Sequence, residues 1–357
     1  MAIYIFKRLV LMIPTLFFIL LINFCIVQIA PGGPVEQRIQ QIEQGQFGVL
    51  GNNENGTTSP AQYYQGARGL SPEIIEKIKA QYGFDQPAYV RFWQMLKAYS
   101  HFDFGESFFK GKKVSELLWE KMPVTLSLGG WSSLLIYALA IYLGIQKAKR
   151  KGTIFDQTTS LFLAMSYAVP MLVFGILLIV FFAGGSYFQW FPLQGLVSEN
   201  FAQLSVFGKI KDYFWHLALP LLTMVLGGLA SLSGLTKYSF IEEMHKQYVI
   251  AARAKGLTEN RVWTGHIFKN AILVLVASLP ETLIGVFFAG TLFVEILFNL
   301  DGLGLLGFEA VSQRDYPVIF GLLFVCTLTG MLLRLCGDVL YLWLDPRLHF
   351  HSIGDNS

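Results

Sequence analysis

Long uninterrupted apolar runs are the feature of this sequence that most limits its fold. Each run is about as long as the roughly 20 residues that an α-helix needs to cross the hydrocarbon core of a bilayer. The runs are continuous rather than alternating, which favours helices over a barrel, because a helix bonds its backbone polar groups within its own segment. The six runs are Leu9–Ala30, Val124–Ile145, Thr159–Ala183, Trp215–Leu235, Ala271–Phe298 and Tyr316–Leu344. The sequence therefore predicts an all-α polytopic membrane protein with six transmembrane helices.

The composition excludes a water-soluble domain of this size. Charged residues make up 14% of the 357 residues and hydrophobic residues 54%, whereas an ordinary soluble domain has roughly 25% charged residues. The net charge of +3 is too small to indicate a nucleic-acid partner. The first run exceeds the apolar core of a cleaved signal peptide, so we expect it to remain as the first helix.

Basic residues in the short loops predict which ends of the helices face the cytoplasm. Lys147, Lys149, Arg150 and Lys151 follow the second run, and the loop after the fourth run is also rich in Lys and Arg, whereas the loops after the third and fifth runs carry few. This pattern places both termini in the cytoplasm. The expected segments are 1–30 (N-terminus and first helix), 31–123 (a long periplasmic loop), 124–344 (a five-helix core with the cytoplasmic loop 237–270) and 345–357 (a cytoplasmic tail).

The long first loop divides into two parts by composition. Residues Gly45–Gly69 are rich in Gly, Asn, Gln, Ser and Thr, which is typical of a flexible insertion. Ser71, followed by Pro72 and Glu73, predicts the start of a helix. A second helical pattern over 90–99 fits either a helix on the outer membrane surface or a packed helix of a periplasmic lobe.

The sequence offers no basis for an enzyme. It has no GxxxxGK[ST] phosphate loop, no HExxH or similar metal-ligand spacing and no nucleophile elbow. We therefore expect no catalytic residues, no bound metal and no cofactor in this chain.

The cytoplasmic loop carries a helix–turn–helix pattern. Its first helix begins with acidic Glu242 and Glu243 and ends before Gly256, a residue suited to the position after a helix. Thr258 is a plausible N-cap for a second short helix. Small residues before the bend suit close docking on another protein, and an amphipathic hairpin resting on the membrane is the alternative.

The segment YVIAARAKGL resembles the EAA loop of binding-protein-dependent ABC importer permeases, in which EAA is followed by three residues and Gly. Ala251, Ala252 and Gly256 fit that pattern, whereas its acidic position falls on Ile250. In the family this loop is the coupling helix that inserts into the ATPase subunit. The resemblance thus implies an ATPase-coupling loop formed by Ala251, Ala252, Arg253, Ala254, Lys255, Gly256 and Arg261.

Further blocks in the same order resemble the B-type dipeptide and oligopeptide permeases along almost the whole chain. The insertion at Gly45–Gly69 is similar to the Yej-type branch, which imports microcin C and oligopeptides. The blocks are KRLVLMIPTLFFILL with APGGP, YGFDQPAYVRF, DFGESFFKGKKVSELL, MPVTLSLG, HLALPLLTMVLG, GTLFVEILFNLDGLGLLGFEAVSQRDYP and LDPRLHF.

The resemblance implies a type I importer permease in the bacterial inner membrane that works by alternating access. Its implied partners are a second homologous permease, two ATPase domains (fused or separate) that bind ATP and Mg, a periplasmic solute-binding protein, membrane lipid and a peptide solute. Permeases for nickel complexes share these motifs, so the solute stays open. A secondary transporter or a channel is the alternative class, although the sequence shows neither an inverted repeat nor a selectivity filter.

Several residues within the predicted helices indicate a translocation path. Pro170 and Pro220 remove backbone donors and are expected to bend their helices around a path. Glu281 has no obvious partner in its own helix, so we expect it to face the path, a polar group of the second permease, or cytoplasmic water. Arg334 and Asp338 stand four residues apart and predict a structural ion pair.

Small residues in the fourth helix, including Gly227, Gly228 and Gly234, predict close helix–helix approach.

Overall fold

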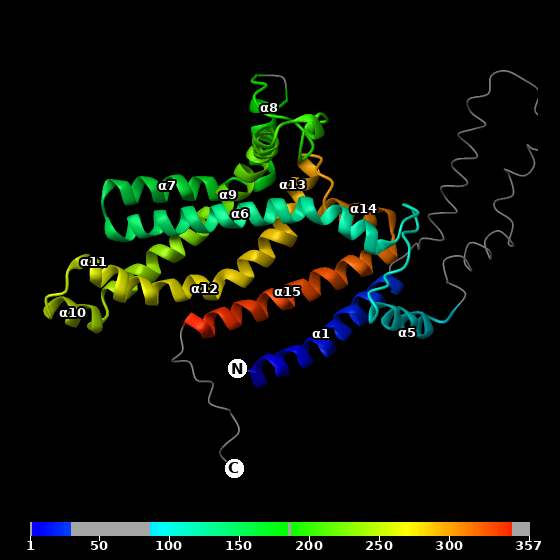
Figure 1. Ribbon diagram of the computed structural model, residues 1–357, viewed down its shortest axis with the longest axis horizontal. Coiled ribbons are helices and arrows are strands. Elements are labelled where there is room, and N and C mark those ends of the chain that lie inside the picture. Colours follow the sequence, from blue (N-terminus) through cyan, green and yellow to red (C-terminus); the bar gives the residue numbers. More distant parts are fainter. Residues whose placement is uncertain (1, 30–85, 185–186, 345–357) are drawn as a thin grey trace, which may run out of the picture. The chain divides into compact units, whose positions relative to one another are not determined.

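The computed structural model describes residues 2–29, 86–184 and 187–344, and within these residues the regular elements are helices (Figure 1). The expected insertion at Gly45–Gly69, the helix at Ser71 and the tail 345–357 lie outside the described residues. The all-α fold is confirmed for the part of the chain that the structure describes.

Five helical segments of the described chain are long and apolar enough to cross a membrane, or six if one bent pair counts as a single span. They include α1 (Ala2–Ile29), α6 (Val114–Lys149), α9 (Val206–Met244) and α15 (Tyr316–Leu344). The fifth is a continuous rod over Glu259–Leu297. Helix α15 has the bounds that the sequence predicts for the sixth span. Helices α6 and α9 begin earlier than predicted, at Val114 instead of Val124 and at Val206 instead of Trp215.

The rod is built from α11 (Glu259–Val262), η2 (Trp263–Ile267), α12 (Phe268–Ile284), η3 (Gly285–Gly290) and α13 (Thr291–Leu297). Its segments η2 and η3 are π-helical, a form that usually occurs as single turns inside α-helices. The fifth span therefore begins at Glu259, well before the predicted Ala271.

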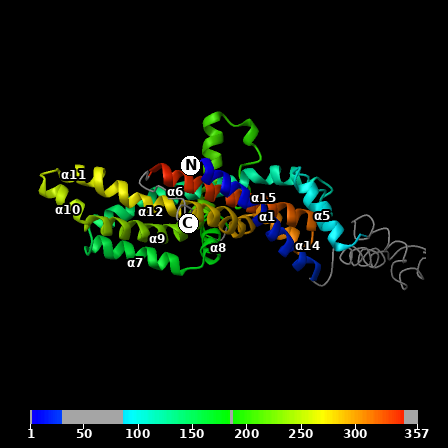
Figure 2. The same ribbon diagram turned by 90° about the horizontal axis from the view of Figure 1, so that it is seen from below.

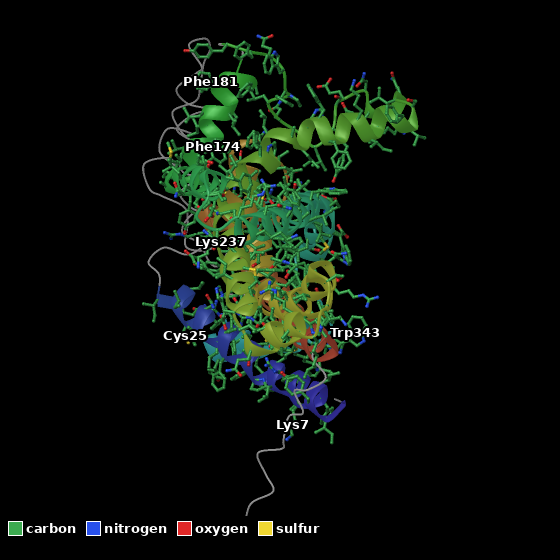
Figure 3. The ribbon with its side chains drawn as sticks, turned by 90° about the vertical axis from the view of Figure 1, so that its left-hand side faces the viewer. Lys7, Cys25, Phe174, Phe181, Lys237 and Trp343 are labelled. Atoms are coloured by element: carbon green, nitrogen blue, oxygen red, sulfur yellow. The ribbon has the colours of Figure 1, made fainter. Side chains whose placement is uncertain are left out.

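The third predicted span is bent at Pro170, as expected, rather than being one straight helix. It consists of α7 (Ile154–Ala168) and α8 (Met171–Phe182), which meet at 94°. Pro170 lies at the break, and the residue before it, Val169, is extended, because proline disfavours the helical conformation in its predecessor. Phe174 and Phe181 mark the two ends of α8 (Figure 3).

The chain divides into two compact units. The first comprises residues 1–120 and 306–328, with α1, α5 (Ala88–Tyr99), the start of α6, most of α14 (Leu303–Gln313) and the start of α15. Aromatic rings hold this unit together: Phe92 of α5 lies 5.2 Å from Phe24 of α1, and Tyr99 lies 5.6 Å from Phe324 of α15, centroid to centroid. The predicted helix over 90–99 is thus present and packs through Phe92 and Tyr99.

The second unit comprises residues 121–305 and 329–357 and holds the remaining helices. Within it α7 packs on α9, and the view from below shows the two helices side by side (Figure 2). Helices α6 and α9 approach closely where Gly228 faces Ile136 and where Gly144 faces Thr236, since a Cβ atom at either glycine would collide with its neighbour. The predicted close helix–helix approach at small residues of α9 is confirmed at Gly228. At Gly227 and Gly234 no described helix of this chain approaches closely, because a Cβ atom there would meet open space.

Candidate functional site

The helix–turn–helix hairpin follows the end of α9. After Met244 the chain breaks at His245 and Lys246, forms α10 (Gln247–Ala254), turns at Gly256 and enters α11 (Figure 1). The predicted single helix across this region is therefore two helices. Gly256 has φ +80°, the left-handed conformation predicted for it. Thr258 has the extended conformation of an N-cap, but its side chain makes no capping hydrogen bond.

An apolar face anchors the hairpin to the helices beside it. Val249, Ala252 and Val262 are buried in one cluster with Ala148 of α6 and Phe240 of α9. Trp263 adds to this anchor, because its ring stacks on Phe240 and the Lys149 ammonium lies 4.6 Å above its centroid. The hairpin is therefore packed against the ends of α6, α9 and α12 within the second unit.

A polar network fixes the start of α10. The buried Glu243 carboxylate accepts hydrogen bonds from Lys246 and Tyr248, and the Asn270 side-chain amide donates to the Tyr248 hydroxyl at 2.9 Å. Burial, followed by the bond to Glu243, raises the pKa of Tyr248, and the bond to Glu243 raises the pKa of Lys246. The network ties α9 and α10 to α12.

The opposite face of the hairpin is exposed. Ile250 is 57% exposed, and the Arg253 guanidinium forms an ion pair with Glu259 across the turn at 2.9 Å. The predicted coupling-loop residue Ala252 points inward instead. The coupling-loop residues on the exposed face are Ala251, Arg253, Ala254, Lys255, Gly256 and Arg261. The hairpin thus combines a buried anchor with a small-residue surface flanked by bases.

A buried ion pair joins α7 to α9 in the same unit. The Lys237 ammonium lies 2.6 Å from Asp156 Oδ1, and the Gly152 amide donates to Asp156 Oδ2 at 3.1 Å. Lys237 lies on α9 (Figure 3), and Lys147 of α6 is also buried. Removing one partner of such a pair usually costs about 3–5 kcal/mol. The sequence placed Lys147 and Lys237 among solvated loop bases, and no sequence spacing pointed to Asp156 as a partner.

Glu295 of α13 is a second group that the sequence analysis missed. Its side chain is fully buried and accepts hydrogen bonds from Thr125 Oγ1 at 2.7 Å and from the Leu305 amide at 2.9 Å. The Thr125 hydroxyl in turn accepts from the Leu303 amide at 2.8 Å. The sequence did contain an indication of this site, because Glu295 is an ionisable residue inside the predicted span Ala271–Phe298 and such a residue needs polar partners.

Glu281 and Arg334 face each other on α12 and α15. Arg334 Nη2 lies 3.2 Å from Glu281 Oε1, and their side chains are 68% (Glu281) and 54% (Arg334) exposed. Glu281 therefore has a partner within this chain. The predicted pairing of Arg334 with Asp338 stays a prediction.

The two prolines of the predicted path have different surroundings. Pro170 stands at the break before α8, whereas Pro220 is buried inside the unbroken α9. Among the residues that the structure describes, no group of three or more His, Cys, Asp or Glu side chains is arranged to hold a metal ion.

Comparison with known proteins gives the family. Residues 136–350 match the family model "Binding-protein-dependent transport system inner membrane component". The "Inner membrane ABC transporter permease protein YejB" of Escherichia coli O157:H7 is 50% identical, over 99% of this chain and 100% of its own length. The "Peptidoglycan transport system permease protein YejB" of Agrobacterium fabrum is 49% identical over 98% and 99%, and the "Oligopeptide transport system permease protein AppB" of Bacillus subtilis is 30% identical over 98% and 100%. The chain belongs to the family of inner membrane components of binding-protein-dependent transport systems.

Proposed function

We propose that this chain is the permease subunit of an ATP-driven importer that moves peptides or peptide-like solutes across the bacterial inner membrane. The names of its relatives, an ABC transporter permease, a peptidoglycan permease and an oligopeptide permease, support this function. The chain itself is a transporter subunit rather than an enzyme, and ATP and Mg would bind to its partner subunits. A solute of the microcin C type fits the likeness to the YejB proteins, and a nickel complex is the alternative solute.

The observation that carries this proposal is the two-sided hairpin α10–α11. Val249 and Val262, both fully buried, join it to the membrane helices, while Ala251, Ala254 and Gly256 remain exposed. A partner docked on the exposed face would move the buried face with it. The hairpin therefore suits transmission of motion from an ATPase to α6, α9 and α12 better than passive rest on a lipid surface.

The contact between Lys149 and Trp263 supports a cytoplasmic hairpin. It brings the basic segment after α6 to the same end of the second unit as the basic residues of the hairpin. Basic residues accumulate on the cytoplasmic side of membrane proteins. Both termini would then be cytoplasmic as well.

The surface of α9 suits a second permease. Gly227, Ser231 and Gly234 recur at helical spacing, and a Cβ atom at either glycine would meet open space within this chain. Small residues let membrane helices approach closely where lipid provides no hydrophobic drive. The remaining partners would be two ATPase domains and a periplasmic binding protein.

The exposed pair Glu281–Arg334 marks the proposed path or the contact with the second permease. Charged groups inside a membrane are costly unless they meet water or polar protein groups, and more than half of each side chain is uncovered in this chain.

Replacing Glu281 with Gln is expected to lower peptide uptake several-fold, because Arg334 loses the carboxylate that it contacts. Uptake by vesicles with equal amounts of the chain would be compared with a Glu199→Gln control at an exposed position outside these helices. Unchanged uptake across pH would remove Glu281 from the path.

Co-purification tests the proposed assembly. A tagged copy of the chain, solubilised from its native membrane in mild detergent, should retain a second permease and ATPase chains in a fixed ratio. A Gly256→Pro variant should keep the second permease and lose ATPase chains. Recovery of the chain alone, or of a stable homo-oligomer without an ATPase, would contradict the proposal.

A further inference from the structure

The first unit contains a cavity of about 740 Å³ among α1, α5, the loop after α5 and the start of α15. Polar groups line part of it: Gln28, Arg91, Asp103 and Glu106. Aromatic side chains, including Tyr99, line the rest. The cavity therefore offers one guanidinium, two carboxylates and an apolar wall.

An apolar groove of about 710 Å³ runs along α1 and α5. Its lining includes Phe17, Leu21 and Trp93, and it also includes Cys25, which lies on α1 (Figure 3). Apart from Gln28, the groove is lined by apolar and aromatic side chains and one thiol. In the membrane such a groove takes hydrocarbon.

The cavity and the groove are neighbours, because Phe24 and Gln28 line both. Arg91 lies where the cavity meets the groove and contacts both residues that line the two spaces. Its Nη2 donates to Gln28 Oε1 at 2.7 Å, and its guanidinium carbon lies 6.0 Å from the Phe24 ring centroid. A single ligand with a charged end and a hydrocarbon end would therefore fill both spaces.

We propose that the cavity and the groove together bind one phospholipid with a zwitterionic ammonium headgroup, phosphatidylethanolamine. The Arg91 guanidinium carries N–H donors in a fork that matches a phosphate group. The Asp103 and Glu106 carboxylates accept hydrogen bonds from the primary ammonium, and the groove takes an acyl chain. A peptide also carries ammonium and anionic groups, but it would leave the adjoining apolar groove empty.

Retained lipid tests this proposal. The full complex would be purified in mild detergent, washed with detergent, and exposed to equal amounts of phosphatidylethanolamine, phosphatidylglycerol and phosphatidylcholine before the bound lipid is measured by mass spectrometry. The wild-type complex should retain about one phosphatidylethanolamine per chain in excess over the other two lipids, because choline has no N–H to donate and glycerol no positive charge.

Substitutions in the cavity and the groove test which side chains contact the headgroup and which contact the acyl chain. Arg91→Gln should lower retained phosphatidylethanolamine several-fold, whereas Lys97→Gln, at an exposed base of the same helix outside both linings, should not. The double variant Asp103→Asn and Glu106→Gln should lose the preference for phosphatidylethanolamine, and Glu116→Gln should keep it. Cys25→Trp, which fills the groove, should lower retention and leave the headgroup preference unchanged.

Three outcomes would overturn the proposal. These are equal retention by the Arg91 and Lys97 variants, no headgroup preference in the wild-type complex, and recovery of a peptide in place of lipid. If Arg91→Gln fails to assemble, the headgroup preference of the Asp103/Glu106 variant decides the question within one folded complex.

Discussion

Replacing Gly256 with proline is expected to abolish ATP-driven uptake while the chain still inserts into the membrane. Gly256 has φ +80°, whereas proline holds φ near −65°. Its amide also donates to the Arg253 carbonyl at 2.9 Å, and proline lacks that donor. The turn must therefore take another route, which separates Arg253 from Glu259 and displaces the exposed face of the hairpin. Peptide uptake and the ATPase rate, measured at equal membrane levels of the chain, check this result.

Gly152 supplies the matched control for that experiment. It also has φ +80°, a Cβ atom there would also meet open space, and its amide also makes one hydrogen bond, to Asp156. Gly152→Pro therefore imposes comparable strain on a turn of the same unit outside the hairpin. We expect it to lose far less uptake. Full uptake by the Gly256 variant, or equal loss in both variants, would refute the role given to the hairpin.

Replacing Glu295 with leucine is expected to cause a large loss of stability in the second unit. Leucine has a similar size but leaves the Leu305 amide and the Thr125 hydroxyl without their acceptor in a buried site. Each unsatisfied buried group costs about 1–3 kcal/mol, so the two groups together are expected to cost about 2–6 kcal/mol. The apparent melting temperature in detergent should fall by several degrees.

Two further variants separate this effect from a general loss of charge. Glu295→Gln keeps one acceptor oxygen and should destabilise the protein less than leucine does. Glu199→Leu, at an exposed position of the same unit, should leave the melting temperature close to that of the wild type. Equal melting temperatures for the Glu295 and Glu199 leucine variants would show that the buried network does not support the fold.

The sequence predicts those features that depend on short stretches of chain. The bounds of α15 follow from an apolar run that begins after Asp315 and ends before the tail. The turn at Gly256 follows because the residue after a helix often adopts the left-handed backbone conformation, which glycine adopts most easily. Pro170 predicts a bend before α8 but does not determine the direction in which α8 then runs. Gly175 packs so closely on Leu297 and Thr223 that α8 must lie against α9 and α13, and no local pattern encodes that contact.

The site could be predicted only where its residues are close in sequence. Ala251, Ala254 and Gly256 stand on the exposed face, but the inward side of Ala252 depends on Phe240 and Val262, which meet it only in the folded chain. The pairs Asp156–Lys237 and Glu281–Arg334 join helices distant in sequence. Their charges are visible in the sequence, whereas their partners are not.

Uptake by purified components tests the central claim, that a separate ATPase drives this chain through its hairpin. The chain and its second permease would be placed in liposomes with binding protein and labelled peptide outside, and with or without the ATPase chains and ATP inside. The account predicts accumulation only when the ATPase chains and ATP are both present. Accumulation by the two permeases alone, driven by an ion gradient, would contradict it.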